Sequence, residues 1–200
     1  MATRVQRVVP DGRADLLIEN TGAVRVVGLW DEVALPELPA GTRIRGVRLR
    51  PEAVAAAFRV DASELRNQNV DLSDVVGSRR SRDLVDDRAL DAWVRGVEPD
   101  RRAAAAVRLL ERESVDATAD ALGLSSRQLR RLFDAHVGVG PKTFQRVLRF
   151  QRFVQHADEG VPLARAAADA GYSDQAHMSR EVLRMSGVTP RHLVRERRSS

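Results

Sequence analysis

The feature that most constrains this chain is an internal repeat in its second half. The segment ADALGLSSRQLRRLFDAHVGVGP (119–141) is echoed by ARAAADAGYSDQAHMSREVLRMSGVTP (164–190). After the centre of each segment, the two copies stay in register at one constant offset. The matched pairs are Leu129/Met178, Arg131/Arg180, Phe133/Val182, Gly138/Gly187 and Pro141/Pro190. A repeat of this length predicts two copies of one small structural unit.

Each copy predicts a helix, a tight turn and a second helix. In the first copy, apolar residues recur at helical spacing and the pattern breaks at Gly123. Ser125 suits the N-cap of the second helix, and Gln128 three residues later can complete a capping box. In the second copy the turn carries one extra residue, and Asp174 takes the N-cap place. Two helix-turn-helix units in tandem are a specific arrangement, and their second helices would be the recognition helices.

A longer helix that begins at Pro141 is predicted to join the two units. Its expected buried stripe is Phe144, Val147, Leu148 and Val154. Its other face carries basic side chains with no acid on the same helix before its end, which a DNA phosphate backbone would compensate. At roughly 1.5 Å per residue, about 16 residues span about 24 Å. Two recognition helices at its ends could then reach successive major grooves, about 34 Å apart, so one monomer could read two segments and a dimer would be an addition.

The charge of the chain is distributed unevenly. The net charge is +5, but residues 1–100 carry 15 basic and 17 acidic side chains, whereas residues 101–200 carry 18 and 11. The positive potential therefore lies with the repeat, as a polyanionic partner such as double-stranded DNA requires.

Composition excludes several classes of site. The chain has no cysteine, which excludes disulfides, thiol nucleophiles and zinc fingers. The four histidines are too scattered for a metal site. Asp11 lies in the turn signal PDG, and neither Asp11 nor Asp15 has a nucleophile or histidine nearby in the sequence. We therefore predict no enzyme, no metal and no cofactor. No apolar run is long enough to span a membrane and the start lacks a signal peptide, so a cytoplasmic protein is expected.

The first half is predicted to be rich in strands. Runs at 14–19, 23–29, 33–38 and 42–50 have strand character, with a hairpin turn at 20–22. In the last run the alternation of arginines slips by one residue at Gly46, which predicts a β-bulge there. A helix is expected from Pro51, and the polar run 78–83 is the expected linker. The fold class is α+β: a small N-terminal β-rich domain (1–80), a connecting helix (81–97), and an all-α domain (98–200) of two helix-turn-helix units joined by a linker helix.

Residues 101–198 resemble the AraC/XylS-type DNA-binding domain over its whole length. The strings that carry the resemblance are GLSSRQLRRLF, GVGP, GYSDQAHMSR and the terminal GVTP. The resemblance implies a sequence-specific transcriptional regulator that places its two recognition helices in successive major grooves of a promoter or operator. It departs from the family at Met178 and Val182, where phenylalanine is usual, so the second core is expected to be smaller. Alkyl-transfer repair proteins that borrow this domain need an acceptor cysteine, which this chain lacks.

Positions that match the family's motif supply the expected contact residues. Contacts to base edges are assigned to Arg127, Arg130, Arg131, Gln175, Ala176, Ser179 and Arg180. Contacts to the DNA backbone are assigned to Ser125, Ser126, Gln128, Lys142, Arg146, Arg149, Asp174 and His177, and Arg152 lies on the same basic face.

The front half resembles a poorly characterised domain found ahead of AraC-type domains, through VVPDGRADLLI, RGVRLRP and LSDVVG. It is expected to serve as a sensor or oligomerisation domain, and the chain to be a monomer or homodimer. The alternative function is a small-molecule sensor, whose front domain binds an effector that controls DNA binding. RNA polymerase is a further candidate partner.

Overall fold

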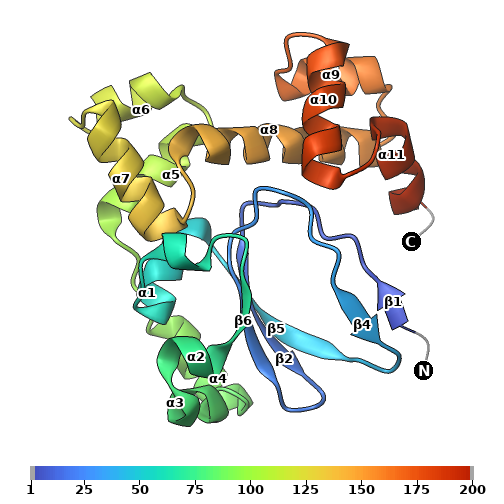
Figure 1. The fold of residues 1–200 in the computed structure, drawn as a ribbon. Helices are drawn as coiled ribbons and strands as arrows, with labels where there is room; N and C mark the ends of the chain where they lie inside the picture. The colour runs from blue at the N-terminus through green and yellow to red at the C-terminus, as the bar shows by residue number, and fades with distance from the viewer. Residues whose placement is uncertain (1–2, 199–200) are drawn as a thin grey trace.

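The front half of the chain forms two small antiparallel sheets. The computed structural model describes residues 3–198 (Figure 1). Strands β2 (Ala14–Glu19), β3 (Val24–Val27), β5 (Ile44–Leu49) and β6 (Asn69–Asp71) form a sheet in the order β5-β2-β3-β6. Strands β1 (Thr3–Val5) and β4 (Glu37–Pro39) form a separate two-stranded ribbon. Alternate residues of β2 are buried, so this sheet has one face in the core, as the sequence alternation predicts.

The predicted β-bulge at Gly46 is wrong. Strand β5 pairs residue for residue with β2 over its whole length, with no extra residue. The bulge was predicted because it would keep one face of the strand buried both before and after Gly46. Ile44 is 41% exposed, however, so the part of the strand before Gly46 need not face the core. Glycine is required for another reason, since a Cβ at this position would lie 2.0 Å from the carbonyl oxygen of Leu16.

Short helices cover the buried face of the four-stranded sheet. Their bounds are η1 (Pro51–Ala53), α1 (Val54–Phe58), η2 (Ala62–Leu65), α2 (Leu72–Val76), α3 (Ser78–Asp83) and α4 (Asp87–Arg95). The polar run 78–83, which was predicted as a linker, instead forms helix α3. The chain turns immediately after this helix, and Leu84 is buried in the core of the front half. Leu90 and Trp93 of α4 pack on the same core, so α4 is attached to the front half. The domain boundary itself stays a prediction.

The second half is entirely helical. It consists of α5 (Arg101–Leu110), α6 (Val115–Ala121), α7 (Ser126–Val137), α8 (Pro141–Asp158), α9 (Leu163–Ala170), α10 (Gln175–Ser186) and α11 (Pro190–Arg198). Figure 1 shows α8 spanning the molecule, with α5, α6 and α7 at one end and α9, α10 and α11 at the other. Two separate apolar clusters form around its two ends, one containing Phe133 and Phe144 and the other Phe150 and Phe153. None of the described helices is both long and apolar enough to cross a bilayer.

The front half packs against both ends of the helical half. Leu29 is buried in the apolar cluster that contains Phe133. The turn after α7 approaches η2 so closely that a Cβ at Gly138, where φ is +94°, would lie 2.7 Å from the carbonyl oxygen of Ala62. In the middle of α8, the side chain of Gln151 donates a hydrogen bond to the carbonyl of Pro10. The front half thus contacts the first unit, the middle of α8 and, through Val9, the apolar cluster of the second unit.

Candidate nucleic-acid interface

The first helix-turn-helix unit consists of α6, a tight turn and α7. Gly123 has a φ of +63° in the turn, a left-handed conformation that glycine adopts without strain. Ser125 is the N-cap of α7, and its Oγ accepts a hydrogen bond from the Gln128 N–H at 3.3 Å. The Gln128 side chain accepts the Ser125 N–H at 2.8 Å, so the predicted capping box is confirmed. Both side chains, which were assigned to the DNA backbone, therefore already hold the start of the helix.

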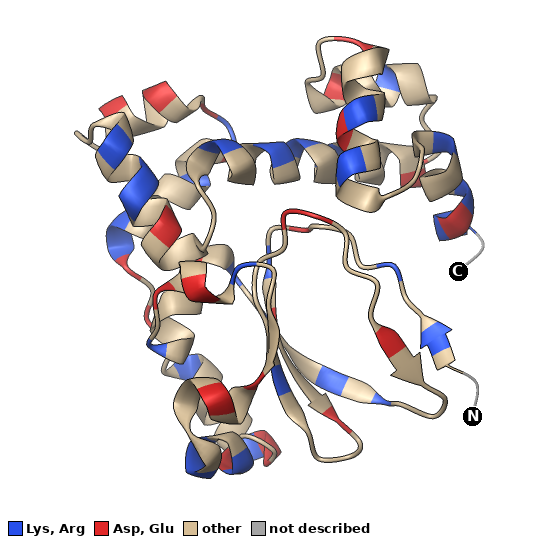
Figure 2. Ribbon diagram, in the orientation of Figure 1, with Lys and Arg blue, Asp and Glu red and all other residues tan. Residues whose placement is uncertain are grey.

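Helix α7 presents a basic face to solvent. Leu129 and Phe133 are fully buried, whereas Arg127, Arg130 and Arg131 are exposed. Figure 2 shows basic residues along α7, and the C-terminal end of α7 lies against η1, η2 and α1 of the front half. The first turns of the helix, which carry these arginines, remain accessible.

The second unit, α9 and α10, repeats this arrangement with fewer charges. Asp174 caps α10 by accepting the His177 N–H at 2.7 Å, and this hydrogen bond lowers the pKa of the Asp174 carboxyl. Met178 is fully buried, while Arg180 is exposed. The other residues assigned to base contacts are Gln175 and Ala176, both exposed, and Ser179, which is half-buried.

His177 lies differently from the rest of its helix. Its ring meets that of Tyr172 edge-on at 5.4 Å between centroids, and its Nδ1 lies 3.1 Å from the Ser173 hydroxyl. The imidazole is therefore half-buried among its own neighbours, and the backbone contact assigned to His177 stays a prediction.

Most of the basic side chains of α8 have partners within the protein. The sequence expectation that they lack acidic partners is wrong for Arg146, whose Nε donates to Oε1 of Glu181 at 2.7 Å. The acid comes from α10, which the sequence of α8 alone could not indicate. Arg149 lies over the Tyr172 ring at 5.4 Å, and Arg152 donates to the carbonyl of Glu111. Among the described residues of α8, Lys142 is exposed and makes no hydrogen bond or ion pair.

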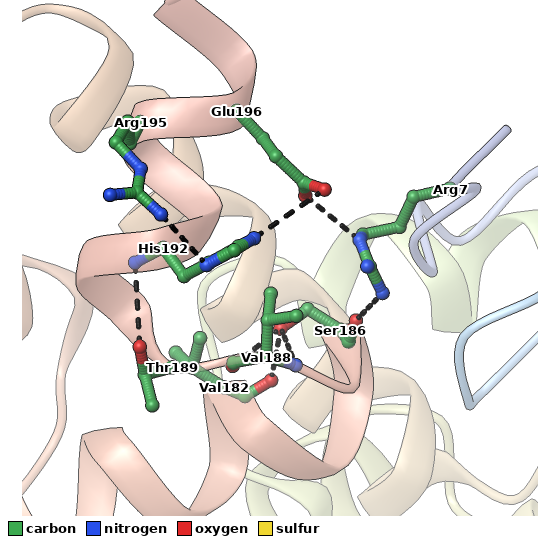
Figure 3. Close-up of polar contacts among 8 residues, drawn as sticks. All are labelled: Arg7, Val182, Ser186, Val188, Thr189, His192, Arg195 and Glu196. Atoms are coloured by element: carbon green, nitrogen blue, oxygen red, sulfur yellow. Dashed lines mark hydrogen bonds and ion pairs between the residues drawn. The ribbon is translucent and has the colours of Figure 1, made fainter.

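A contact from the front half supports the far side of the second unit. Figure 3 shows Arg7 reaching the end of α10 and the side of α11. Its Nη1 donates to the carbonyl of Ser186 at 2.7 Å, and its Nε donates to Oε2 of Glu196 at 2.9 Å. The hydrogen bond from Arg7 holds the pKa of the Glu196 carboxyl below its ordinary value. No local sequence pattern pairs Arg7, Tyr172, Glu181 or Glu196 with its partner, so the sequence does not predict their contacts.

Comparison with known proteins adds to this geometry. Residues 118–196 match the family described as a helix-turn-helix domain, and residues 2–71 match a domain of unknown function, DUF6597. Over 87 residues, or 42% of this chain, the sequence is 32% identical to the bifunctional transcriptional activator/DNA repair enzyme Ada of Escherichia coli (strain K12). The chain spans 25% of the length of that protein.

Solved structures of ToxT from Vibrio cholerae resemble the whole chain. One, an apo variant from strain SCE256, has a TM-score of 0.50 at 10% identity and covers 96% of this chain and 92% of its own. A second ToxT structure has a TM-score of 0.50 at 13% identity, covering 96% of this chain and 97% of its own. At these identities the likeness is one of fold, and it includes both the β-rich front half and the helical half.

Proposed function

We propose that this chain, a regulator of the AraC/XylS type with a helix-turn-helix domain at residues 118–196, binds double-stranded DNA at a specific sequence to regulate transcription. Its fold and family are those of AraC-type regulators. The finer proposal is that α7 and α10 enter two successive major grooves on one face of the duplex.

The observation that carries this proposal is the pair of capped helices with exposed polar faces at the two ends of one continuous helix. Helix α8 has 18 residues, which correspond to about 27 Å at about 1.5 Å per residue. Recognition helices carried at its two ends could therefore reach successive major grooves, which are roughly 34 Å apart along one face. The free N–H groups in the first turn of each capped helix also favour phosphate oxygens.

The residues are proposed to divide their roles by position. Arginines can form paired hydrogen bonds to guanine, and the exposed methyl group of Ala176 can contact only an apolar group such as a thymine methyl. Base contacts are proposed for Arg127, Arg130, Arg131, Gln175, Ala176, Ser179 and Arg180. Backbone contacts are proposed for Ser125, Ser126, Gln128, Lys142, Arg149, His177 and the main-chain N–H of Asp174, whose carboxylate would repel phosphate. Arg146 could add a contact only by leaving Glu181.

Selection of bound sequences from random DNA tests this function. We expect one asymmetric site with two short specified segments about one helical turn apart, bound by a monomer. Repeated half-sites would indicate a dimer instead. If the folded protein enriches no sequence above its level in the starting pool, the proposal is contradicted.

A second candidate function is control of DNA binding by the front half. It is supported by the contacts of the front half with both units, through Leu29 at one end and Arg7 at the other. A small molecule bound to the front half could act on the recognition helices through these contacts. Thermal shift against a metabolite library tests it: a hit that also changes DNA affinity supports the sensor function. A library without hits would favour a role in dimerisation or in contact with RNA polymerase.

A further inference from the structure

Helix α10 carries a buried acidic side chain directly behind its exposed face. Glu181 is 6% exposed, although carboxylates are rarely buried and removing one from water is costly unless it is paired. The pairing comes from the linker helix, where Nε of Arg146 donates to Oε1 of Glu181 at 2.7 Å. This contact joins the second recognition helix to α8 by a charge-assisted hydrogen bond.

The second oxygen of this carboxylate is only weakly held. Oε2 of Glu181 has no hydrogen-bond partner among the described residues, and it lies 3.7 Å from Nε2 of His177. The hydroxyl of Tyr172 is also buried without a partner in the described part of the chain. Burial and the negative charge of Glu181 both raise the pKa of the Tyr172 hydroxyl, so it stays protonated. Among the described residues, Arg146 therefore makes the shortest contact with Glu181, and His177 and Tyr172 lie around the other oxygen.

The rest of the contact between α8 and α10 is apolar, and two methionines contribute to it. Met178 and Met185 lie in the same cluster as Phe150 and Phe153 of α8. Methionine side chains are flexible and tolerate small shifts of their neighbours. Such a cluster keeps α10 buried against α8 but does little to restrict the rotation of α10 about its own axis. A charged hydrogen bond, in contrast, has a narrow range of allowed geometry.

The first unit has no such pair at the matching position. At the offset that relates the two copies, Glu181 corresponds to Leu132, which is partly buried against the apolar cluster of the first unit. The acid is thus a property of the second unit alone, and the first unit serves as an internal control.

We propose that Glu181 and Arg146 are positioning residues that set the orientation of α10 on the linker helix, and thereby the base preference of the second unit. The proposal rests on the proposed function, since it concerns how α10 meets DNA. Glu181 itself is buried and negatively charged, so it acts on DNA only through the exposed residues of its own helix. Arg146 acts mainly through Glu181 rather than through phosphate.

The test uses Glu181→Gln in the full chain, with Glu159→Gln as the matched control. Both changes remove one negative charge, and Glu159 is an exposed residue at the end of α8. Long-range electrostatics should therefore strengthen DNA binding equally in both variants. We expect Glu181→Gln to lose about tenfold in discrimination at bases of the second segment, because the amide oxygen can still accept from Arg146 but the hydrogen bond loses its charge assistance. Discrimination in the first segment should not change, and Glu159→Gln should discriminate in both segments like the unmodified chain.

Arg146→Met separates positioning from phosphate contact. Loss of a phosphate contact would reduce the slope of log K against log salt by about 0.9 and weaken all sequences alike. We expect instead an unchanged slope and the same loss of selectivity in the second segment as for Glu181→Gln. A reduced slope with intact selectivity would overturn the proposal.

A double variant keeps the test decisive if a single change unfolds the second unit. Arg146→Met with Glu181→Leu replaces a buried ion pair by apolar side chains, which is often tolerated in stability. We expect a folded protein by thermal melting that has lost selectivity in the second segment only. Full selectivity in both segments would overturn the positioning role. Absence of any sequence preference in the unmodified chain would contradict the proposed function itself, so the two failures are distinguishable.

Discussion

At the scale of single residues, Arg131 and Arg180 are the most informative side chains on the two recognition helices. They occupy matching places in the two copies, and both are exposed. Neither forms a hydrogen bond or ion pair with the described residues, whereas Arg130 lies 3.5 Å from a carboxylate oxygen of Asp134. Each of the two can therefore meet a base without giving up an internal contact.

Replacing either arginine tests their assignment. We expect Arg131→Ala and Arg180→Ala each to cost about 1–3 kcal/mol on the selected site and to relax the preference at one base pair. Equilibrium binding to the site and to single-base variants of it measures both effects. Arg165→Ala, an exposed residue of α9 that pairs with Asp169, is the control for loss of one positive charge. Unchanged affinity of the variant lacking both Arg131 and Arg180 would refute their role.

At the scale of elements, the start of α7 depends on its capping box. Ser125 and Gln128 satisfy backbone N–H groups that would otherwise lack partners within the helix. The same two side chains were assigned to DNA contact, so stability and binding are connected at this turn.

Removing the cap should lower stability measurably. We expect Ser125→Ala to reduce the free energy of unfolding by about 1 kcal/mol, because the Gln128 N–H loses its acceptor. Urea denaturation followed by circular dichroism measures the change. Ser126→Ala, one position inside the helix, is the control and should change stability by less. Equal effects of the two variants would count against the cap.

At the scale of the whole molecule, the front half and the two units form one connected body. The segment after β1, which contains Arg7, reaches the second unit, while Leu29 and η2 pack on the first (Figures 1 and 3). The relative placement of α7 and α10 thus depends on α8 and on the front half together.

The contact between Arg7 and Glu196 should depend on pH. Because the pKa of Glu196 is lowered from 4.5 in the folded state, its contribution is fully present above that value and is lost as pH falls through the lowered value. We therefore expect Arg7→Leu to destabilise the protein more at pH 7 than at about pH 3.5. Part of the effect should remain at low pH, since the carbonyl of Ser186 does not titrate. Urea unfolding of the unmodified chain and of Arg7→Leu at the two pH values measures the difference in their free energies of unfolding. If this difference is the same at both pH values, the ion pair is not its source.

The spacing of the DNA site should be fixed by α8. Insertion of about 5 base pairs between the two segments moves the second segment to the opposite face of the duplex, because one turn is about 10.5 base pairs. We expect such a site to bind no better than the first segment alone, as measured by gel shift or fluorescence anisotropy. Retained affinity would show that the two units are flexibly connected, which would contradict a rigid α8.

The sequence by itself determined the local elements and the repeat. The capping box at Ser125, the cap at Asp174 and the long helix from Pro141 all follow from contacts within a few residues, so spacing alone predicts them. The exposed arginines of α7 follow equally from helical periodicity. The strand run 42–50 was found for the same reason, although its predicted bulge was not.

Tertiary structure alone decided which distant side chains meet. The straight pairing at Gly46 depends on how close the backbone of β2 lies, and helix α3 depends on the core that receives Leu84. The partner of Arg146 is 35 residues away in sequence, and that of Arg7 is 189 residues away. Such pairs leave no periodic trace, because each joins elements whose relative placement is set by packing rather than by the local chain.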